Sequence, residues 1–150
     1  MTIGARGKAA ETKVRDYLKT VQATDINFDF ERIQDARAAG GAFAAQVGDF
    51  YAFREYKGVH RSFILEVKEV DHEYRLPAKN FKKEQIARMR KRMWAGQRPI
   101  VLVYFSPKKL WREVPLTYFI DHLDAPSWDL REFELKPLPE ALAPKLEIQC

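Results

Sequence analysis

Apolar and polar residues alternate along the chain with two different periods, and the change of period divides the chain into elements. Apolar residues recur at helical spacing over residues 5–22, which predicts a first helix. Residues 27–34 alternate instead, which is typical of a strand, and the apolar runs over 47–56 and 62–70 predict two more strands. Because only a short connection with a Lys-Gly turn joins the last two runs, we expect them to form an antiparallel hairpin.

The second half of the chain begins with its most regular helical pattern, over residues 80–95. Asn80 is a good N-cap for this helix, and Gly96 is expected to end it. Residues 99–105 form a continuous apolar run, which is typical of a strand buried on both faces. The order helix, strand, strand, strand, helix, strand predicts an α/β fold, in the α+β sense of a mixed central sheet flanked by helices.

The overall composition is that of a globular protein. The length of 150 residues fits one domain, and a content of 46% apolar residues is enough for a packed core. The three tryptophans, Trp94, Trp111 and Trp128, are either core residues or stacking platforms for bases. Their apolar neighbours in the sequence favour the core for each. No apolar run approaches the roughly 18 residues of a membrane-spanning helix, and the start of the chain lacks a signal-like apolar stretch. We therefore expect a cytoplasmic protein that does not enter a membrane.

The net charge of +5 is distributed unevenly along the sequence. Residues 121–150 carry a charge of −4, so the first 120 residues carry +9. Within these, residues 75–92 hold eight Lys or Arg side chains and a single acid. Such a segment is typical of a protein that binds a polyanion such as nucleic acid, although it also fits a solvated helix face that only keeps the protein soluble.

Candidate chemistry lies in the strand predicted over residues 62–70. Side chains two apart on a strand share a face, so Glu66 and Lys68 stand side by side, opposite an apolar face. By itself this pattern is more typical of the polar side of a one-sided strand. Asp49 changes the interpretation, because it lies in the apolar run of the neighbouring strand and adds a second carboxylate.

Two neighbouring carboxylates repel each other unless a cation keeps them ionised. Mg²⁺ prefers oxygen ligands and is usually held by one or two carboxylates together with water and substrate phosphate. Such an ion activates a water molecule and neutralises charge that develops on phosphorus, while a lysine orients the water or stabilises that charge. The three histidines, His60, His72 and His122, lack the spacing of a zinc site, and the single cysteine, Cys150, excludes a thiolate cluster. These residues therefore favour Mg²⁺.

Two sequence segments resemble a known class of nuclease. The pattern GDF followed by LEVKE resembles the PD-(D/E)xK nuclease superfamily, with Asp49, Glu66 and Lys68 in the motif positions. The next segment, LPAKNFKKEQIARM, is similar to the RecU-type Holliday junction resolvases, which have an E-x-K-E strand, a Pro-Lys-Asn-Phe segment and a helix with a Gln-Ile pair. The Arg-Gly pair near the amino terminus and Glu11 resemble the start of that family.

The resemblance implies that residues 1–150 form one nuclease domain, with a restriction-endonuclease-like core over about 4–105 and a diverged C-terminal extension over about 106–150. It implies a Mg²⁺-dependent, structure-specific DNA endonuclease, most simply a Holliday junction resolvase that makes symmetric nicks by water attack on phosphodiesters. Four-way junction DNA and a second copy of the chain in a homodimer would be its partners. Two alternatives stay open: a restriction- or repair-type endonuclease on linear duplex DNA, and a non-catalytic DNA-binding module on the same fold.

The same resemblance assigns roles to residues of the motif. Asp49 and Glu66 would be metal ligands, and the backbone carbonyl of Val67 would complete the ligand set. Lys68 would be the catalytic lysine. The metal implied is Mg²⁺, and Mn²⁺ is expected to substitute for it.

Two further side chains and a set of cations extend this expected site. Glu11 would supply a further catalytic carboxylate through water, or would be a solvent-facing helix residue. Gln85, in the matched position of the basic helix, would orient Lys68 or a phosphate. The expected DNA-binding side chains are cations of the amino terminus and of the basic segment: Arg6, Lys79, Lys82, Lys83, Arg88, Arg90, Lys91 and Arg92.

Overall fold

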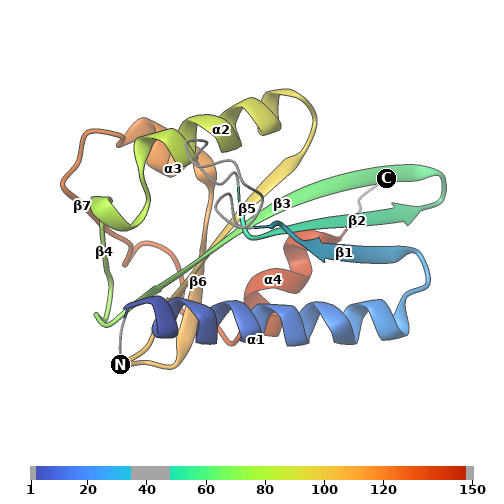
Figure 1. Ribbon diagram of the computed structural model, residues 1–150, viewed down its shortest axis with the longest axis horizontal. Coiled ribbons are helices and arrows are strands. Elements are labelled where there is room, and N and C mark those ends of the chain that lie inside the picture. Colours follow the sequence, from blue (N-terminus) through green and yellow to red (C-terminus); the bar gives the residue numbers. More distant parts are fainter. Residues whose placement is uncertain (1–2, 35–47, 148–150) are drawn as a thin grey trace.

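A mixed five-stranded sheet forms the centre of the protein, as Figure 1 shows for a computed structural model that describes residues 3–34 and 48–147. The segment between the first two predicted strands, residues 35–47, lies outside the described residues. In spatial order the strands are β1 (Phe28–Arg32), β2 (Phe50–Tyr56), β3 (Val59–Val70), β5 (Arg98–Phe105) and β6 (Leu110–Val114). The β3 and β5 strands run parallel, and the other three neighbouring pairs run antiparallel. The mixed sheet and the β2–β3 hairpin are therefore confirmed.

Helices cover both faces of this sheet and enclose two groups of buried side chains (Figure 1). On one face lie α1 (Ile3–Thr24) and α4 (Leu138–Leu146), and on the other lie α2 (Lys83–Trp94) and α3 (Leu116–Asp121). The α1 helix packs because Ala10, Val14 and Leu18 recur four residues apart and are fully buried. Among the described residues, no helix has both the length and the apolar character needed to span a membrane.

The central strands β3 and β5 are buried on both faces, which the apolar run at 99–105 predicted for β5. In β3, Leu65 belongs to the core under α1, and Ile64 belongs to the core under α2. Each such fully buried aliphatic side chain contributes about 1.5–3 kcal/mol to folding. A polar group on β3 is therefore held between well-packed layers, where its position is fixed.

The segment after residue 105, predicted as a diverged extension, contributes to both cores. Its β6 strand pairs with β5 at the edge of the sheet, and α4 buries Leu142 and Leu146 against α1. A short strand, β7 (Ser127–Asp129), pairs with β4 (Arg75–Pro77) in a second, two-stranded sheet. The pattern did not predict β4, because a three-residue strand lacks a measurable period and its partner lies far along the chain.

The predicted start of the basic helix is wrong. A separate 3-10 helix, η1 (Ala78–Asn80), precedes α2, and Asn80 therefore does not cap the helix. Phe81 is extended and buried to 1% exposure, so it separates the two helical pieces. The Lys82 N–H donates to Gln85 Oε1 at 3.2 Å, which satisfies one of the free donors at the helix start. Gly96, with φ of +108°, ends the helix as predicted.

The prediction that all three tryptophans lie in the core is wrong for one of them. Trp111 and Trp128 are buried at 3% and 2% exposure, but Trp94 is 70% exposed. Trp94 occupies the last turn of α2, to the side of the buried stripe that contains Ile86 and Met89. The Arg90 guanidinium lies 4.9 Å from the centre of its ring. Apolar neighbours in the sequence therefore did not bury this side chain, because its position five residues after Met89 turns it away from the buried stripe of the helix.

Candidate active site

The β3 strand carries a charged pair on the face that packs toward α2. Glu66 is buried to 3% exposure, and Lys68 lies two residues further along the same face. The Lys68 Nζ lies 3.0 Å from Glu66 Oε1, so the two side chains form a largely buried ion pair. Because β3 is central and its neighbours are packed, the carboxylate and the ammonium have little freedom to move apart.

Asp49 lies beside this pair because the chain that enters β2 is held against β3. The Asp49 N–H donates to Leu65 O at 2.7 Å, and Asp49 Oδ2 accepts the Val67 N–H at 2.6 Å. Gly48 allows this approach, since a Cβ at that position would lie 2.9 Å from Ile64 Cγ1. The register places Asp49, at 6% exposure, next to Glu66. The two carboxylates that the sequence pattern singled out therefore do come together.

The electrostatics of the two carboxyl groups follow from this burial. Burial raises the pKa of Asp49 well above its usual value, and the charges of Glu66 and Glu11 raise it further, while the Val67 N–H lowers it. Burial also raises the pKa of Glu66, although the Lys68 ammonium opposes that rise. Both shifts mean that keeping the two groups ionised in this environment is costly unless a cation is close to both.

The donor set fits a hard divalent cation. Glu66 Oε2 is buried and has no hydrogen-bond partner among the described residues, so one carboxylate oxygen is available to a ligand. Within residues 3–34 and 48–147, no group of three or more His, Cys, Asp or Glu side chains forms a metal site by itself. Mg²⁺ does not require one, because it is commonly held by one or two carboxylates with waters and substrate oxygens. Asp49 and Glu66 provide such a pair.

Glu11 of α1 lies at the border of the pair. Its side chain is 25% exposed, and Glu11 Oε2 lies 3.6 Å from the Arg32 guanidinium. Its negative charge acts on both Asp49 and Glu66. The structure thus places Glu11 with the other two acids, and its environment differs from that of a residue that faces solvent alone.

Gln85 lies at the start of α2, opposite the charged pair. Its Oε1 accepts a hydrogen bond from Lys68 Nζ at 3.5 Å as well as the bond from the Lys82 N–H. Lys68 Nζ also lies 5.1 Å from the centre of the Phe81 ring. Phe81 was not among the predicted site residues, although it belongs to the KNF segment that carried the resemblance. The helix start therefore positions the lysine through one amide and one aromatic ring.

The predicted DNA-binding cations are spread over the surface around α2. Four of them are exposed: Lys79, Lys82, Arg88 and Lys91. Two are partly buried, since Arg90 lies over the ring of Trp94 and Arg92 over the ring of Tyr51. The remaining one, Lys83, forms an exposed ion pair with Asp124. The side chain of Arg6 lies outside the described part of the chain. Gln85, Arg88 and Arg92 share one side of the helix by their spacing of three and four residues. At one end of this side Gln85 contacts Lys68, and at the other Arg92 lies over the half-buried ring of Tyr51 in β2.

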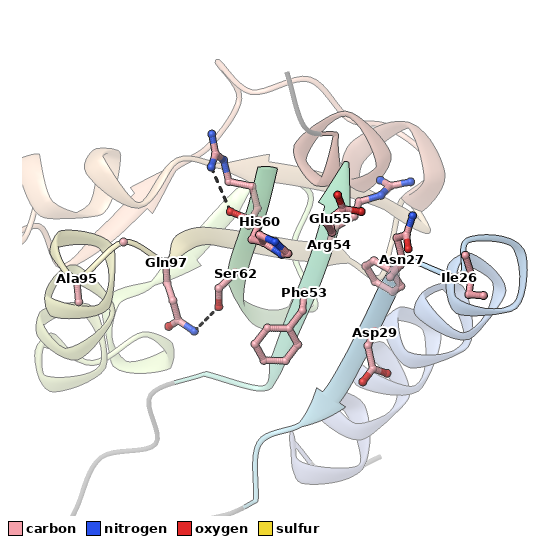
Figure 2. Close-up of a pocket in the computed structure, with 13 residues that line it drawn as sticks. Ile26, Asn27, Asp29, Phe53, Arg54, Glu55, His60, Ser62, Ala95 and Gln97 are labelled. Atoms are coloured by element: carbon pink, nitrogen blue, oxygen red, sulfur yellow. Dashed lines mark hydrogen bonds between the residues drawn. The ribbon is translucent and has the colours of Figure 1, made fainter. Parts of the chain in front are cut away.

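A hollow of about 550 Å³ lies further along the sheet, near the end of α2 (Figure 2). Figure 2 shows Phe53 of β2 between Asp29 on one side and Ser62 and Gln97 on the other. The Gln97 side-chain amide donates to Ser62 Oγ at 2.9 Å. None of the candidate catalytic side chains lines this hollow, so it is distinct from the carboxylate pair.

Comparisons with solved structures find likenesses to this chain. The chain is similar to the solved structure of Hjc from Archaeoglobus fulgidus, a Holliday junction resolvase from an archaeal hyperthermophile. The two chains share 18% sequence identity with a TM-score of 0.45, over 74% of this chain and 73% of that one. No protein-family model matches the chain, and no curated protein matches it.

Proposed function

We propose that this protein is a Mg²⁺-dependent DNA endonuclease and that its substrate is branched DNA, most simply a four-way junction. The observation that carries the proposal is the arrangement of Asp49, Glu66 and Lys68. Two buried carboxylates lie side by side, and Glu66 Oε2 has no hydrogen-bond partner within the described part of the chain. The Lys68 ammonium lies 3.0 Å from the other oxygen of Glu66, Oε1. This is the set of groups that metal-assisted phosphodiester hydrolysis requires.

In this proposal, Asp49 and Glu66 hold the metal with their oxygens, together with the carbonyl of Val67. Bound Mg²⁺ would lower the pKa of a water molecule and would place a positive charge beside the scissile phosphate. Lys68 donates hydrogen bonds either to the attacking water or to the phosphate oxygen on which charge develops. Gln85 keeps the ammonium in position, and Glu11 accepts a hydrogen bond from water at the rim of the site.

The proposed reaction adds water to phosphorus in line with the leaving oxygen. The P–O3′ bond breaks, so the products carry a 5′-phosphate and a 3′-hydroxyl. The attacking water gives one proton to solvent or to a carboxylate, and the leaving O3′ takes one proton from solvent. The site excludes bulk water from its inner side, because β3 and α2 bury Glu66. The fixed charges therefore act in a medium of lower dielectric than water and are stronger there.

The DNA partner is supported by charge. The cations Arg6, Lys79, Lys82, Lys83, Arg88, Arg90, Lys91 and Arg92 would contact phosphates, and such contacts position DNA without reading its sequence. A four-way junction has two-fold symmetry, so two symmetric nicks are most simply made by a homodimer with two-fold symmetry. The preference for a junction over linear duplex is supported by the KNF and Gln-Ile segments of the sequence, which resemble those of RecU-type resolvases.

The experiment is a cleavage assay on a synthetic four-way junction and on a linear duplex of matched sequence, with Mg²⁺, Mn²⁺ or EDTA. We expect cuts in the junction with either metal and none in EDTA. Asp49→Ala and Lys68→Ala should each slow cutting by about 10²–10³-fold, as the loss of a group that stabilises the transition state does elsewhere. Lys57→Ala, which removes an exposed lysine at the tip of the β2–β3 hairpin, is the matched control and should cut normally.

Each part of the proposal has its own refuting result. Normal cutting by Lys68→Ala would show that Lys68 is not a catalytic residue. Equal rates on junction and linear duplex would remove the junction preference and leave a nuclease of broader specificity. DNA binding without cleavage under every metal condition would favour a non-catalytic DNA-binding module.

A further inference from the structure

A second cavity, of about 220 Å³, lies on the α1 side of the candidate active site. Its walls come from one side of α1, from the end of β1 and from the start of β2: Lys8, Glu11, Thr12, Arg15, Arg32 and Phe50. Two of these residues connect it to the carboxylates. Phe50 directly follows Asp49 in the chain, and Glu11 is close enough to Asp49 and Glu66 for its charge to act on both.

The chemistry of this cavity suits an anion. Three of the six lining side chains are cations and one is a carboxylate, so the lining is positive overall. Lys8, Arg15 and Glu11 share one side of α1, since they are spaced by three and four residues. Arg32 approaches the same space from β1, where its guanidinium lies 3.6 Å from Glu11. Cations therefore converge on the cavity from a helix and from a strand.

The existing ion pairs of these arginines are weak enough to exchange for a ligand. Arg15 pairs with Asp16 at 3.2 Å, and both side chains are largely exposed. The side chain of Arg32 is 63% exposed where it pairs with Glu11. Exposed pairs of this kind contribute about 0–1 kcal/mol, whereas an arginine can hold a phosphate through two parallel hydrogen bonds.

We propose that this cavity binds one backbone phosphate of the DNA, next to the scissile phosphate on the cleaved strand; the inference rests on the proposed nuclease function. A backbone phosphate fits better than a nucleobase, because the only ring in the lining, that of Phe50, is 1% exposed and cannot serve as a stacking surface. The cations of α2 lie on the other face of the sheet. The cleaved strand is thus held on both sides of Asp49 and Glu66.

The test measures DNA binding without cleavage, by fluorescence anisotropy of a labelled four-way junction in EDTA over a range of salt concentrations. Arg15→Gln and Arg32→Gln should each lower the slope of log affinity against log salt by about 0.9, the value for one lost phosphate contact. Lys13→Gln is the matched control. It removes one charge from the same helix, but Lys13 lies on the other side of α1, over the ring of Tyr104.

A second measurement locates the phosphate. Uncharged methylphosphonate groups replace single phosphates along the cleaved strand, and binding of each substituted junction is compared between the wild type and Arg15→Gln. Substitution at the one position that enters the cavity should weaken binding by the wild type several-fold and should weaken binding by Arg15→Gln by a clearly smaller factor, since Arg32 remains. At other positions both proteins should lose affinity equally, since groups that do not interact have additive effects.

The outcomes separate this inference from the proposed function. If Arg15→Gln and Arg32→Gln bind like Lys13→Gln, the cavity is not a phosphate site, even when the wild type cuts junctions. If the two variants lose binding as expected but no metal condition supports cleavage, the cavity assignment stands as a DNA contact and the nuclease proposal fails. Absence of any DNA binding by the wild type overturns both.

Discussion

Replacing Gly48 by alanine tests how closely the chain before β2 must approach β3 to place Asp49. An added Cβ would lie 2.9 Å from Ile64 Cγ1 and 3.1 Å from the Leu65 carbonyl oxygen. Carbon atoms in contact prefer about 3.5–4.0 Å, so the chain must move by roughly 0.5–1 Å to relieve the overlap. The Leu65 oxygen also accepts the Asp49 N–H, so any such movement displaces the carboxylate.

The expected magnitudes follow from this overlap. Forcing one extra methyl group into a packed core costs about 1–3 kcal/mol, so Gly48→Ala should lower the free energy of unfolding by that amount. A displacement of about 1 Å at a catalytic group can lower the rate by about 10²-fold. We therefore expect a loss of stability together with a loss of junction cleavage of about two orders of magnitude.

Urea denaturation measures the first effect, and single-turnover cleavage of a junction at saturating enzyme measures the second. Gly58→Ala is the control, because its added Cβ meets no atom within 4 Å but its φ of +79° is strained for alanine. That strain should cost about 1–2 kcal/mol of stability without moving Asp49. Full activity in Gly48→Ala, or an equal loss of rate in Gly58→Ala, would refute the reasoning.

Three further predictions concern the metal, the tryptophans and the helix start. In EDTA the stability of the wild type should fall as pH rises above about 4, the ordinary carboxyl pKa, because a raised pKa means that the folded state binds the proton more tightly than the unfolded state. Asp49→Asn should be more stable than the wild type in EDTA at neutral pH, and added Mg²⁺ should raise the melting temperature of the wild type only; an equal rise in Asp49→Asn would contradict the assigned ligand. Trp94→Ala should change the free energy of unfolding by no more than about 0.5 kcal/mol, whereas Trp128→Ala should lower it by about 3–5 kcal/mol, as urea denaturation can measure. Gln85→Ala should lower the free energy of unfolding by about 1 kcal/mol, because the helix loses its cap. It should also slow cleavage of the junction, because Lys68 is no longer held in position, while binding of the junction is retained. An unchanged cleavage rate would show that Gln85 acts in the cap alone.

The local sequence was sufficient to predict four of the five strands of the sheet and the charged pair, but not the edge strand β6. Strand periodicity is set within a few residues, because alternate side chains must point to opposite faces, and this places Glu66 and Lys68 together wherever the strand packs. The hairpin follows from a short turn between two apolar runs. For the same reason, Asp49 could be placed on the strand next to the one that carries Glu66, although its position along that strand was not predicted.

Features that depend on distant partners could not be predicted in this way. The β4 strand exists because it pairs with β7, more than 45 residues later in the chain. Trp94 is exposed although its neighbours in the sequence are apolar, because only the side of α2 that carries Ile86 and Met89 is buried against the rest of the protein. The α2 helix begins at Lys83 and not at the predicted residue 80, because the extended, buried Phe81 interrupts the helical pattern.

By itself, the sequence of this protein determined its alternating elements, its mixed sheet and the pairing of a carboxylate with a lysine on β3. Only the tertiary structure decided how deeply Glu66 is buried, how Gln85 and Phe81 meet Lys68, and which cations of α1 and β1 share a cavity beside the acids. The physical reason is that periodicity fixes the direction of a side chain relative to its own backbone. Burial and the meeting of charges depend on packing between segments that are far apart in the chain.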